Sequence, residues 1–559
     1  MKAKNNILRN GALILLSRQT NILSAATVIM VNVAASRILG LIRDRLLASY
    51  FGSSATLGVY FAAFRLPDMI FQLLVMGALA TAFIPVMTSL ISKKKKELAW
   101  QVASSVLNIG LVGFFVLSIF ICFYAKKLSQ LIAPGFNQEE LVLMANLTRV
   151  MIVAQFFFIL SNYLTGILQS FKRFLIPALA PVLYNLGIIV GIIFLSPKLG
   201  IYGPALGVII GTFLHFIIQL PQAKSLGLKY RLTFNWRQKE VKEIGRLMLP
   251  RTIGLAVSQI DYTVDVALAS LISASSLIYL NFAQHLQLLP VGLFGATIAQ
   301  AALPTLAEEG DKKDLGNFKK TLSTSFQQII FLVMPFSVLL IILRVPVVRL
   351  VFGAARFDWQ ATLLTGQVLA FFSLSLFAQA AVHILARAFY ALRDTKTPVF
   401  IGALSVLTNV FTSIYFILVL KLPVWGLGLS TSIANILNAS LLLIFLNKKV
   451  KGFKEQRLFH SSLKIFIVSF ITAFALYIPM KLLDQLVFDT TRVGGLLLLT
   501  IIASLFGFAV YFFLSWLFRV EIFMSFSKLF ERAEDFQKIL RGKSLEPIEV
   551  HDESTQFHS

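Results

Sequence analysis

Long apolar stretches recur along this chain and are separated by short polar connections. A stretch of about 20 apolar residues crosses a hydrocarbon core of about 30 Å at the helical rise of about 1.5 Å per residue. Strands of a membrane barrel need only about ten residues, so the stretches are too long for a barrel. The pattern predicts an all-α polytopic membrane protein with about fourteen transmembrane helices, at residues 22–48, 58–91, 101–124, 142–170, 174–196, 201–222, 244–272, 275–307, 318–343, 358–391, 397–420, 424–447, 461–485 and 493–518.

Composition agrees with this prediction and limits the function. Of the 559 residues, 57% are hydrophobic and 14% are charged, and the mean hydropathy is +0.80. These values exclude an ordinary soluble domain. A net charge of +25 suits a nucleic-acid partner, but the basic residues lie in short connections between apolar stretches and form no basic domain. We therefore expect no nucleic-acid partner.

The distribution of basic residues predicts the orientation in the membrane. Lysine and arginine gather in alternate loops, at 93–96, 172–173, 224–242 and 448–457, whereas the opposite loops contain fewer. Loops rich in these residues stay in the cytoplasm, so both termini are expected on the cytoplasmic side. Cys122 is the only cysteine, which excludes a disulfide within the chain.

The longest polar connection before the tail divides the chain into two lobes of six helices each. The expected parts are, in order, an interfacial segment, an N-lobe, a cytoplasmic linker, a C-lobe, two added helices, and an amphipathic helix with a polar tail, at residues 1–21, 22–222, 223–243, 244–448, 449–518 and 519–559. The polar tail has the composition of a disordered segment.

The two lobes repeat one another in sequence. Ser36–Leu41 parallels Pro250–Leu255, and Asn185 parallels Asn409, so corresponding residues lie 214 to 224 positions apart. Six helices separate equivalent elements, and this even number gives both copies the same orientation, related by an axis along the membrane normal. We expect a cavity between the two lobes.

Ionisable residues lie inside several predicted helices. A charged side chain at the bilayer centre costs roughly 2.5–3.5 kcal/mol on insertion scales, so these residues are expected to face the protein interior. Arg37 and Asp44 are seven residues apart and share a face of the first helix, whereas Arg43 projects about 120° away. The candidate binding residues are Arg37, Arg43, Asp44, Arg65, Asp68, Arg251 and His285.

Two interpretations of these charges remain open. Internal ion pairs would hold the helices in register without a ligand. The pairs considered are Arg37 with Asp44, Arg65 with Asp68, and Arg251 with Asp261 or Asp265. Alternatively, the arginines line the cavity and bind a phosphate-bearing substrate, because a guanidinium donates paired hydrogen bonds to phosphate oxygens. The chain has no phosphate-binding glycine loop and no nucleophile motif, so we expect a transporter and not an enzyme.

Several motifs together resemble one family. They are Ser36-Arg37-x-Leu39-Gly40-x-x-Arg43-Asp44, Phe61-x-x-Phe64-Arg65-Leu66-Pro67-Asp68, Gly77-Ala78-Leu79-x-x-Ala82-Phe83-x-Pro85 and Arg387-Ala388-Phe389-Tyr390-Ala391-Leu392-x-Asp394. Over nearly its whole length the chain resembles the MurJ (MviN) family of lipid II flippases. The resemblance implies the fold of the multidrug/oligosaccharidyl-lipid/polysaccharide exporter superfamily, with a cationic central cavity and a lipid-tail groove formed by the two added helices. It also implies export of an undecaprenyl-linked peptidoglycan precursor across the bacterial cytoplasmic membrane by alternating access.

The chain departs from the family pattern around the second and eighth helices. Gly58, Phe71 and Met76 stand where many members carry charged residues, and His285 stands where an arginine is common. Fewer permanent positive charges would face the substrate, and binding is expected to vary with pH through His285.

The resemblance also bears on a coupling ion. The family has been linked to a sodium site in the second lobe, for which Asp261 or Asp265 with Asn409 would serve here. Ser413 stands where a second carboxylate is expected. No cofactor is expected apart from coupling to sodium or to protons.

The sequence therefore favours a flippase of the lipid-linked peptidoglycan precursor, lipid II. Its pyrophosphate would be bound by the arginines Arg37, Arg43, Arg65 and Arg251. Asp44 and Asp68 would orient it, and His285 would be a further donor. The protein is expected to work as a monomer among membrane lipids, with contact to the cell-wall synthesis machinery. The alternatives are an exporter of O-antigen or teichoic-acid type lipid-linked oligosaccharides, a multidrug/cation antiporter, and a membrane scaffold that transports nothing.

Overall fold

The computed structural model describes residues 22–77, 82–312, 314–452, 455–490 and 492–524. All regular secondary structure in these ranges is helical, as expected. The predicted interfacial segment at 1–21, and all but the first residues of the predicted C-terminal helix and tail, lie outside the described residues.

The first half of the chain packs around α7 and α10, which contact each other and several neighbouring helices. Its helices are α2 (Ile22–Phe51), α3 (Ala55–Ala63), α4 (Arg65–Phe71), α5 (Ile84–Ser92), α6 (Lys96–Ile132), α7 (Gln138–Ser170), α8 (Leu175–Val190), α9 (Ser196–Leu199), α10 (Tyr202–Ile217) and α11 (Leu220–Ser225). Residues 226–238, here called the linker, join α11 to the second half.

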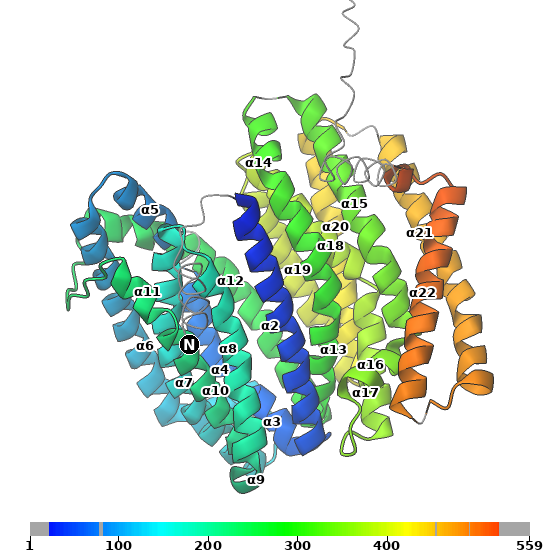
Figure 1. Ribbon diagram of the computed structural model, residues 1–559, viewed down its shortest axis with the longest axis horizontal. Coiled ribbons are helices and arrows are strands. Elements are labelled where there is room, and N and C mark those ends of the chain that lie inside the picture. Colours follow the sequence, from blue (N-terminus) through cyan, green and yellow to red (C-terminus); the bar gives the residue numbers. More distant parts are fainter. Residues whose placement is uncertain (1–21, 78–81, 313, 453–454, 491, 525–559) are drawn as a thin grey trace, which may run out of the picture.

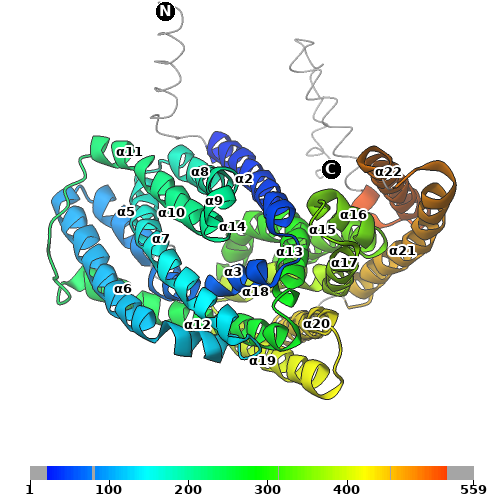
Figure 2. The ribbon, with the colours of Figure 1, turned by 90° about the horizontal axis from the view of Figure 1, so that it is seen from below.

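The second half packs around α15, α18 and α20. Its helices are α12 (Lys239–Ile272), α13 (Ser276–Pro290), α14 (Thr297–Asp311), α15 (Leu315–Ile342), α16 (Arg344–Phe352), α17 (Trp359–Ser373), α18 (Leu376–Ala391), α19 (Lys396–Ile414), α20 (Trp425–Lys449), α21 (Glu455–Leu482) and α22 (Val493–Leu517). Figure 2 shows α21 and α22 at one edge of the molecule and α6 toward the opposite edge.

Most of the predicted membrane crossings match helices of sufficient length and apolarity. In the described ranges twelve helical segments qualify, or thirteen when α17 and α18, bent by 42°, are taken as one span. These thirteen correspond to the crossings predicted from residue 58 onward. α2, the first predicted crossing, has 30 residues and carries four charged side chains in its second half, and it is not among them.

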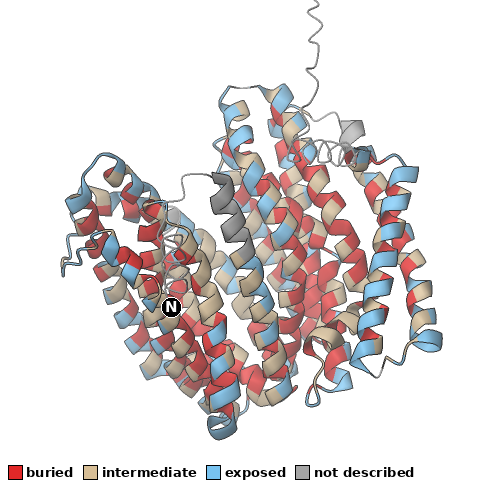
Figure 3. Cartoon of the chain, in the orientation of Figure 1, coloured by how far each residue is buried: buried red, intermediate tan, exposed pale blue. Residues whose placement is uncertain are grey.

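Large apolar side chains cover the outside of the helices. Phe123 is 81% exposed, Phe194 is 69% exposed and Phe411 is 71% exposed. Figure 3 shows exposed residues along the outer helices and buried residues where helices face one another. Soluble monomers rarely expose large contiguous apolar patches, so this surface is one that lipid covers.

Short π-helical segments interrupt the helices at matching places in the two halves. η1 (Gln72–Met76) and η4 (Val291–Ala296) begin 219 positions apart, and η3 (Gly191–Leu195) and η5 (Tyr415–Val419) begin 224 positions apart. Both separations fit the internal repeat expected from the sequence. π-helical turns frequently mark functional sites.

α10 approaches α8 and the adjoining η3 closely along glycines. A Cβ atom at Gly187 would lie 2.3 Å from Cα of Gly211, and one at Gly191 would lie 2.5 Å from Cα of Gly207. In each helix the two glycines are four residues apart and therefore share a face. Small residues at this spacing let helix backbones meet inside a membrane, where close packing holds helices together.

The two halves meet at the end of the bundle that contains Phe51. Ser275 Oγ donates a hydrogen bond to the carbonyl oxygen of Ser53 (2.6 Å), and Arg356 Nη1 donates one to the carbonyl oxygen of Tyr50 (2.6 Å). We call this the Phe51 end and the opposite one the linker end. In Figure 1 the Phe51 end is at the bottom, and α2 runs between the two halves.

Replacement of Gly187 by leucine is expected to lower thermal stability, because the new side chain must displace the α10 backbone at Gly211. Overpacking of a tight contact typically costs about 1–3 kcal/mol. Thermal unfolding of the purified protein in detergent measures the effect as a lowered melting temperature. Gly402→Leu is the control, since a Cβ atom at Gly402 meets no atom within 4 Å. Equal melting temperatures for the two variants would contradict the packing argument.

Candidate functional site

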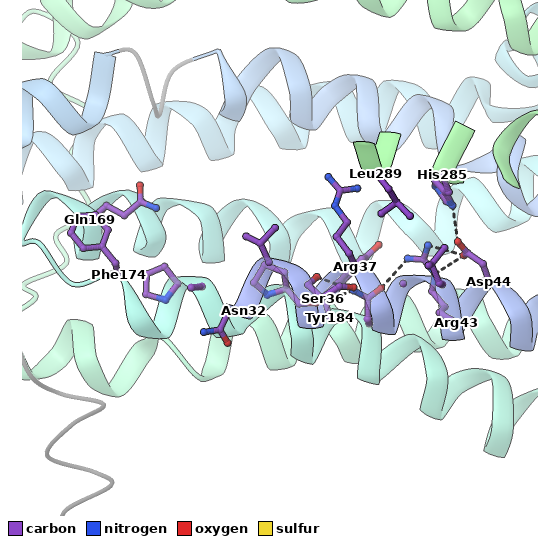
Figure 4. A pocket seen from close by; sticks show the side chains of 17 residues that line it. Asn32, Ser36, Arg37, Arg43, Asp44, Gln169, Phe174, Tyr184, His285 and Leu289 are labelled. Atoms are coloured by element: carbon purple, nitrogen blue, oxygen red, sulfur yellow. Dashed lines mark hydrogen bonds and ion pairs between the residues drawn. The ribbon is translucent and has the colours of Figure 1, made fainter. Parts of the chain in front are cut away.

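A pocket of about 460 Å³ lies between α2, α8 and α13. α2 contributes Arg37, Arg43 and Asp44 to its lining, and α13 contributes His285. Gln169, at the linker end of α7, also lines the pocket, so the pocket reaches that end of the bundle. Figure 4 shows the charged residues of α2 following one another along the pocket.

The carboxylate of Asp44 is shared between Arg43 of its own helix and His285 of α13. Oδ1 accepts hydrogen bonds from Arg43 Nε (2.9 Å) and Nη2 (2.8 Å), and Oδ2 lies 2.6 Å from His285 Nδ1. The Asp44 side chain is only 2% exposed. A buried carboxylate needs such partners, because its lost hydration is otherwise uncompensated. Since His285 belongs to the second half of the chain, this contact joins the two halves.

Arg37 differs from the other charged residues of the pocket because it has no polar partner. In the part of the chain that the structure describes, it makes no hydrogen bond and no ion pair, and its exposed side chain extends into the pocket. The ion pair considered with Asp44 is not formed. Two helical turns separate the residues by about 10 Å along the axis, and Asp44 is bound to its neighbour instead. Arg43, which we expected to project away from this face, lines the same pocket.

A smaller cavity of about 210 Å³ adjoins the pocket, and Arg43 and His285 line both. Arg65 and Asp68 of α4 contribute to the lining of the smaller cavity. They do not form the ion pair considered from the sequence, because each is turned toward a different helix. Asp68 accepts a hydrogen bond from Gln155 Nε2 of α7 (3.1 Å).

Arg65 connects the first half of the chain to α12. Its Nε donates to Thr263 Oγ1 (2.7 Å), and its Nη2 donates to the carbonyl oxygen of Gln259. The guanidinium carbon lies 4.8 Å from the centre of the Tyr262 ring. With 3% exposure and these three contacts, Arg65 is a structural tie between the halves.

Arg251 lies in a different pocket from the other candidate residues. This pocket, of about 390 Å³, is lined by α12, α19 and α20 and contains Arg251, Asp261 and Asn409. The larger pocket between α2, α8 and α13 has no lining residue from α12. Arg251 makes no ion pair with either aspartate of its helix in the described chain. The grouping of Arg251 with Arg37 expected from the sequence is therefore not the arrangement in this structure.

The candidate cation residues lie together and have unused oxygen atoms. Asp261 Oδ1 accepts a hydrogen bond from Asn409 Nδ2 (2.8 Å). Asn409 Oδ1 and Asp265 Oδ1 are buried and have no hydrogen-bond partner. Ser413 Oγ lies 2.6 Å from Ser430 Oγ. Within the described ranges no three His, Cys, Asp or Glu side chains form a metal-binding group.

The structure explains two of the departures noted in the sequence. A Cβ atom at Gly58 would lie 1.9 Å from the carbonyl oxygen of Ala274, so a side chain there would force the two halves apart. Phe71 is buried, with its ring centre 4.7 Å from that of Phe158. Met76 is 41% exposed, and nothing in the structure explains the choice of methionine there.

Asn185 is a site residue that the sequence marks only as a landmark of the repeat. Its Oδ1 accepts a hydrogen bond from Arg43 Nη1 (3.1 Å), and its Nδ2 donates to the carbonyl and the hydroxyl of Ser36 (both 3.2 Å). It therefore fixes Arg43 from the side opposite Asp44. The sequence signal that could have identified Asn185 is a polar amide within an apolar stretch, and Gln155 shows the same signal.

Comparisons with known proteins agree with this arrangement. The family described as "Lipid II flippase MurJ" matches residues 47–499. A protein named probable lipid II flippase MurJ from Buchnera aphidicola subsp. Acyrthosiphon pisum is 30% identical over 413 residues, which cover 73% of this chain and 80% of that protein. The lipid II flippase MurJ of Burkholderia cenocepacia is 28% identical over 422 residues, covering 74% and 81%.

Solved structures show the same relationship. A structure titled "Lipid II flippase MurJ, inward closed conformation" is 28% identical, has a TM-score of 0.72, and is matched over 87% of this chain and 98% of its own. An inward-facing multidrug transporter of the MATE family and the MOP superfamily is 16% identical with a TM-score of 0.65, which shows a shared fold alone. Because the family match spans most of its length, this chain belongs to the lipid II flippase MurJ family.

Proposed function

We propose that this protein is a flippase that moves lipid II, the undecaprenyl-pyrophosphate-linked peptidoglycan precursor, to the outer leaflet of the bacterial cytoplasmic membrane. The observation that carries the proposal is a pocket with an unpartnered arginine near its middle and a shared arginine, carboxylate and histidine beyond it. Arginine suits pyrophosphate, because its planar guanidinium donates paired hydrogen bonds and keeps its charge in a dry site. The family to which the chain belongs supports this choice of cargo.

The pyrophosphate meets Arg37 first and then the group around Asp44. Arg37 is free to bind, whereas Arg43 and His285 already contact the Asp44 carboxylate. Pyrophosphate oxygens compete with that carboxylate for the same two hydrogen-bonding side chains. Release of Asp44 from His285 removes one contact between the two halves, so cargo binding favours a change in how the halves meet.

In this proposal, the pocket faces the cytoplasm and receives cargo from there. Both termini are cytoplasmic, since the positive-inside rule assigns the linker end to that side. The pocket reaches the linker end, while Arg45 and Arg356 bond across the halves at the Phe51 end. An inside-negative membrane potential favours outward movement of an anion by about 2.3 kcal/mol per charge per 100 mV. Opening at the Phe51 end then releases the cargo outside.

The polyprenyl tail lies against apolar surface of the second half. A pocket of about 510 Å³ between α15, α18, α20 and α21 is lined mostly by apolar side chains, among them Phe326, Phe377 and Phe466. α21 is one of the two helices expected to form a lipid-tail groove, whereas α22 does not line this pocket. One chain contains every part of this path, so the protein acts as a monomer and passes its cargo to the enzymes of cell-wall synthesis.

A cation bound at Asp261, Asp265 and Asn409 resets the empty carrier. These residues supply oxygen atoms, two of which are buried without partners. A monovalent cation at this place would satisfy both orphaned oxygens and offset the charge of the paired aspartates. Movement of the cation down its gradient would then favour the return to the state that receives cargo.

Loss of the Arg37 side chain is expected to abolish transport without unfolding the protein, because Arg37 makes no hydrogen bond or ion pair among the described residues. The measurement is rescue of a bacterium depleted of its own lipid II flippase, with untranslocated lipid II determined at equal membrane levels of each variant. Wild type should rescue and Arg37→Ala should fail. Arg393→Ala, which removes an exposed arginine paired with Asp311, is the control and should rescue.

Rescue by Arg37→Ala would refute the role given to Arg37. Failure of well-expressed wild type to lower untranslocated lipid II would refute lipid II as the cargo. In that case the same pocket is better explained by export of a different lipid-linked oligosaccharide that also carries a pyrophosphate.

Sodium is expected to stabilise the wild type, and Asp265→Asn should remove the effect because it removes a buried anionic oxygen. A ligand at ten times its Kd stabilises the state that binds it by about 1.4 kcal/mol. Melting temperatures in sodium and in choline chloride at equal ionic strength measure this difference. Asp484→Asn, an exposed position, is the control. A sodium effect that persists in Asp265→Asn would contradict the site.

A further inference from the structure

The linker is fixed to α6 by a buried asparagine. Asn108 Nδ2 donates hydrogen bonds to the carbonyl oxygens of Arg231 (3.0 Å) and Thr233 (2.9 Å), and Asn108 Oδ1 accepts one from the hydroxyl of Tyr230 (2.8 Å). The amide of Arg231 donates to Ser104 Oγ (3.1 Å). Because Asn108 is 3% exposed and its amide uses both ends, the linker has a defined position on the first half of the molecule.

The other side of the linker presents apolar side chains that nothing in the described chain covers. Leu232 is 75% exposed, Phe234 is 49% exposed and Trp236 is 62% exposed. Thr233, between the first two of them, instead turns its hydroxyl toward α6, where it lies 3.2 Å from Ser105 Oγ. We call these three residues the linker face.

The linker face lies at the level where α6 enters the lipid. α6 has 37 residues and is about 55 Å long, more than the hydrocarbon core of about 30 Å requires. Its exposed large apolar side chains begin at Ile109 and continue to Leu131, a length of about 33 Å. Asn108, which holds the linker, immediately precedes this apolar belt. Figures 1 and 2 both show the linker on the outside of the molecule next to α6.

Basic residues flank the linker face. The Arg237 guanidinium lies 5.1 Å from the centre of the Trp236 ring. Lys239 and Lys242, on the first turns of α12, are exposed. Tryptophan favours the membrane–water interface, and basic residues beside it attract anionic headgroups of the cytoplasmic leaflet. Apolar side chains next to basic ones, at the height where the apolar belt of α6 begins, match an anionic lipid surface. A protein partner would not explain why the linker face lies at that height.

We propose that the linker face, with Arg237, Lys239 and Lys242, is a docking surface for anionic phospholipid at the cytoplasmic interface. The three apolar side chains enter the headgroup boundary, and the three cations bind lipid phosphates. α12 starts directly after this anchor, so the lipid surface holds the point from which the second half begins. This role does not depend on which cargo the pocket binds.

The depth of the linker face can be measured with a nitroxide at Leu232→Cys in a Cys122→Ser background, which removes the only native cysteine. The full-length protein is placed in vesicles of phosphatidylethanolamine and phosphatidylglycerol. Accessibility to oxygen should exceed accessibility to a water-soluble nickel reagent at residue 232. The reverse is expected for the control Lys312→Cys, which is exposed at the linker end. Equal, aqueous values at both positions would overturn the proposal.

The charge requirement is tested by the triple variant Arg237→Gln/Lys239→Gln/Lys242→Gln. Burial of the label at residue 232 should be greater with phosphatidylglycerol than with phosphatidylcholine alone, and the triple variant should lose this difference. The matched control is the triple variant Lys93→Gln/Lys94→Gln/Lys95→Gln, which should keep this difference. These lysines lie just before α6 and precede Asn108 by at least about 18 Å along the helix axis. A label equally buried in both lipids would overturn the anionic specificity. Burial seen in native membranes but absent from pure lipid vesicles would mean that a protein covers the face.

Discussion

A buried carboxylate in a membrane protein is costly unless polar groups bind it, and here Asp44 is bound by Arg43 from its own helix and by His285 from the opposite half. This requirement places His285 against α2 and thereby brings the first and second halves together beside the pocket. Because Asp44 pairs with Arg43 and His285, Arg37 is left without a partner among the described residues that line the pocket. A cargo anion can therefore bind at Arg37 without breaking a contact of that side chain in the described structure, and then exchange with Asp44 at Arg43 and His285. Binding and the contact between the halves share the same side chains.

In each half an asparagine at the same position of the repeat bonds a charged side chain, and the two charges have opposite sign. Asn185 of α8 accepts a hydrogen bond from Arg43, whereas Asn409 of α19, its counterpart in the repeat, donates one to Asp261. An amide can do both, because it carries an acceptor oxygen and a donor nitrogen. The first half thus presents a cation at this place and the second half presents an anion. This asymmetry supports the proposal of an anionic cargo in the first half and a coupling cation in the second.

Much of the fold could be read from the sequence, because long apolar stretches have few alternatives to helices in a membrane. The repeat could also be predicted from the sequence, and the π-helical segments recur at its spacing.

The partners of the buried charges could not be predicted from the sequence. Arg65 and Asp68 are spaced to meet on a helix, yet Thr263 and Gln155 from other helices bind them instead. Residue spacing describes one helix, whereas the partner of a buried charge is decided by the helices packed against it.

The central claim is that cargo pyrophosphate and the Asp44 carboxylate compete for the same two side chains, Arg43 and His285. Binding of undecaprenyl pyrophosphate to the purified protein, measured for wild type and for Asp44→Asn, tests this directly. Asparagine keeps the size of the side chain and removes its charge, so the variant should bind the pyrophosphate more tightly than wild type. Weaker binding by Asp44→Asn would show that the carboxylate supports the cargo site instead of competing with it, and would contradict the account.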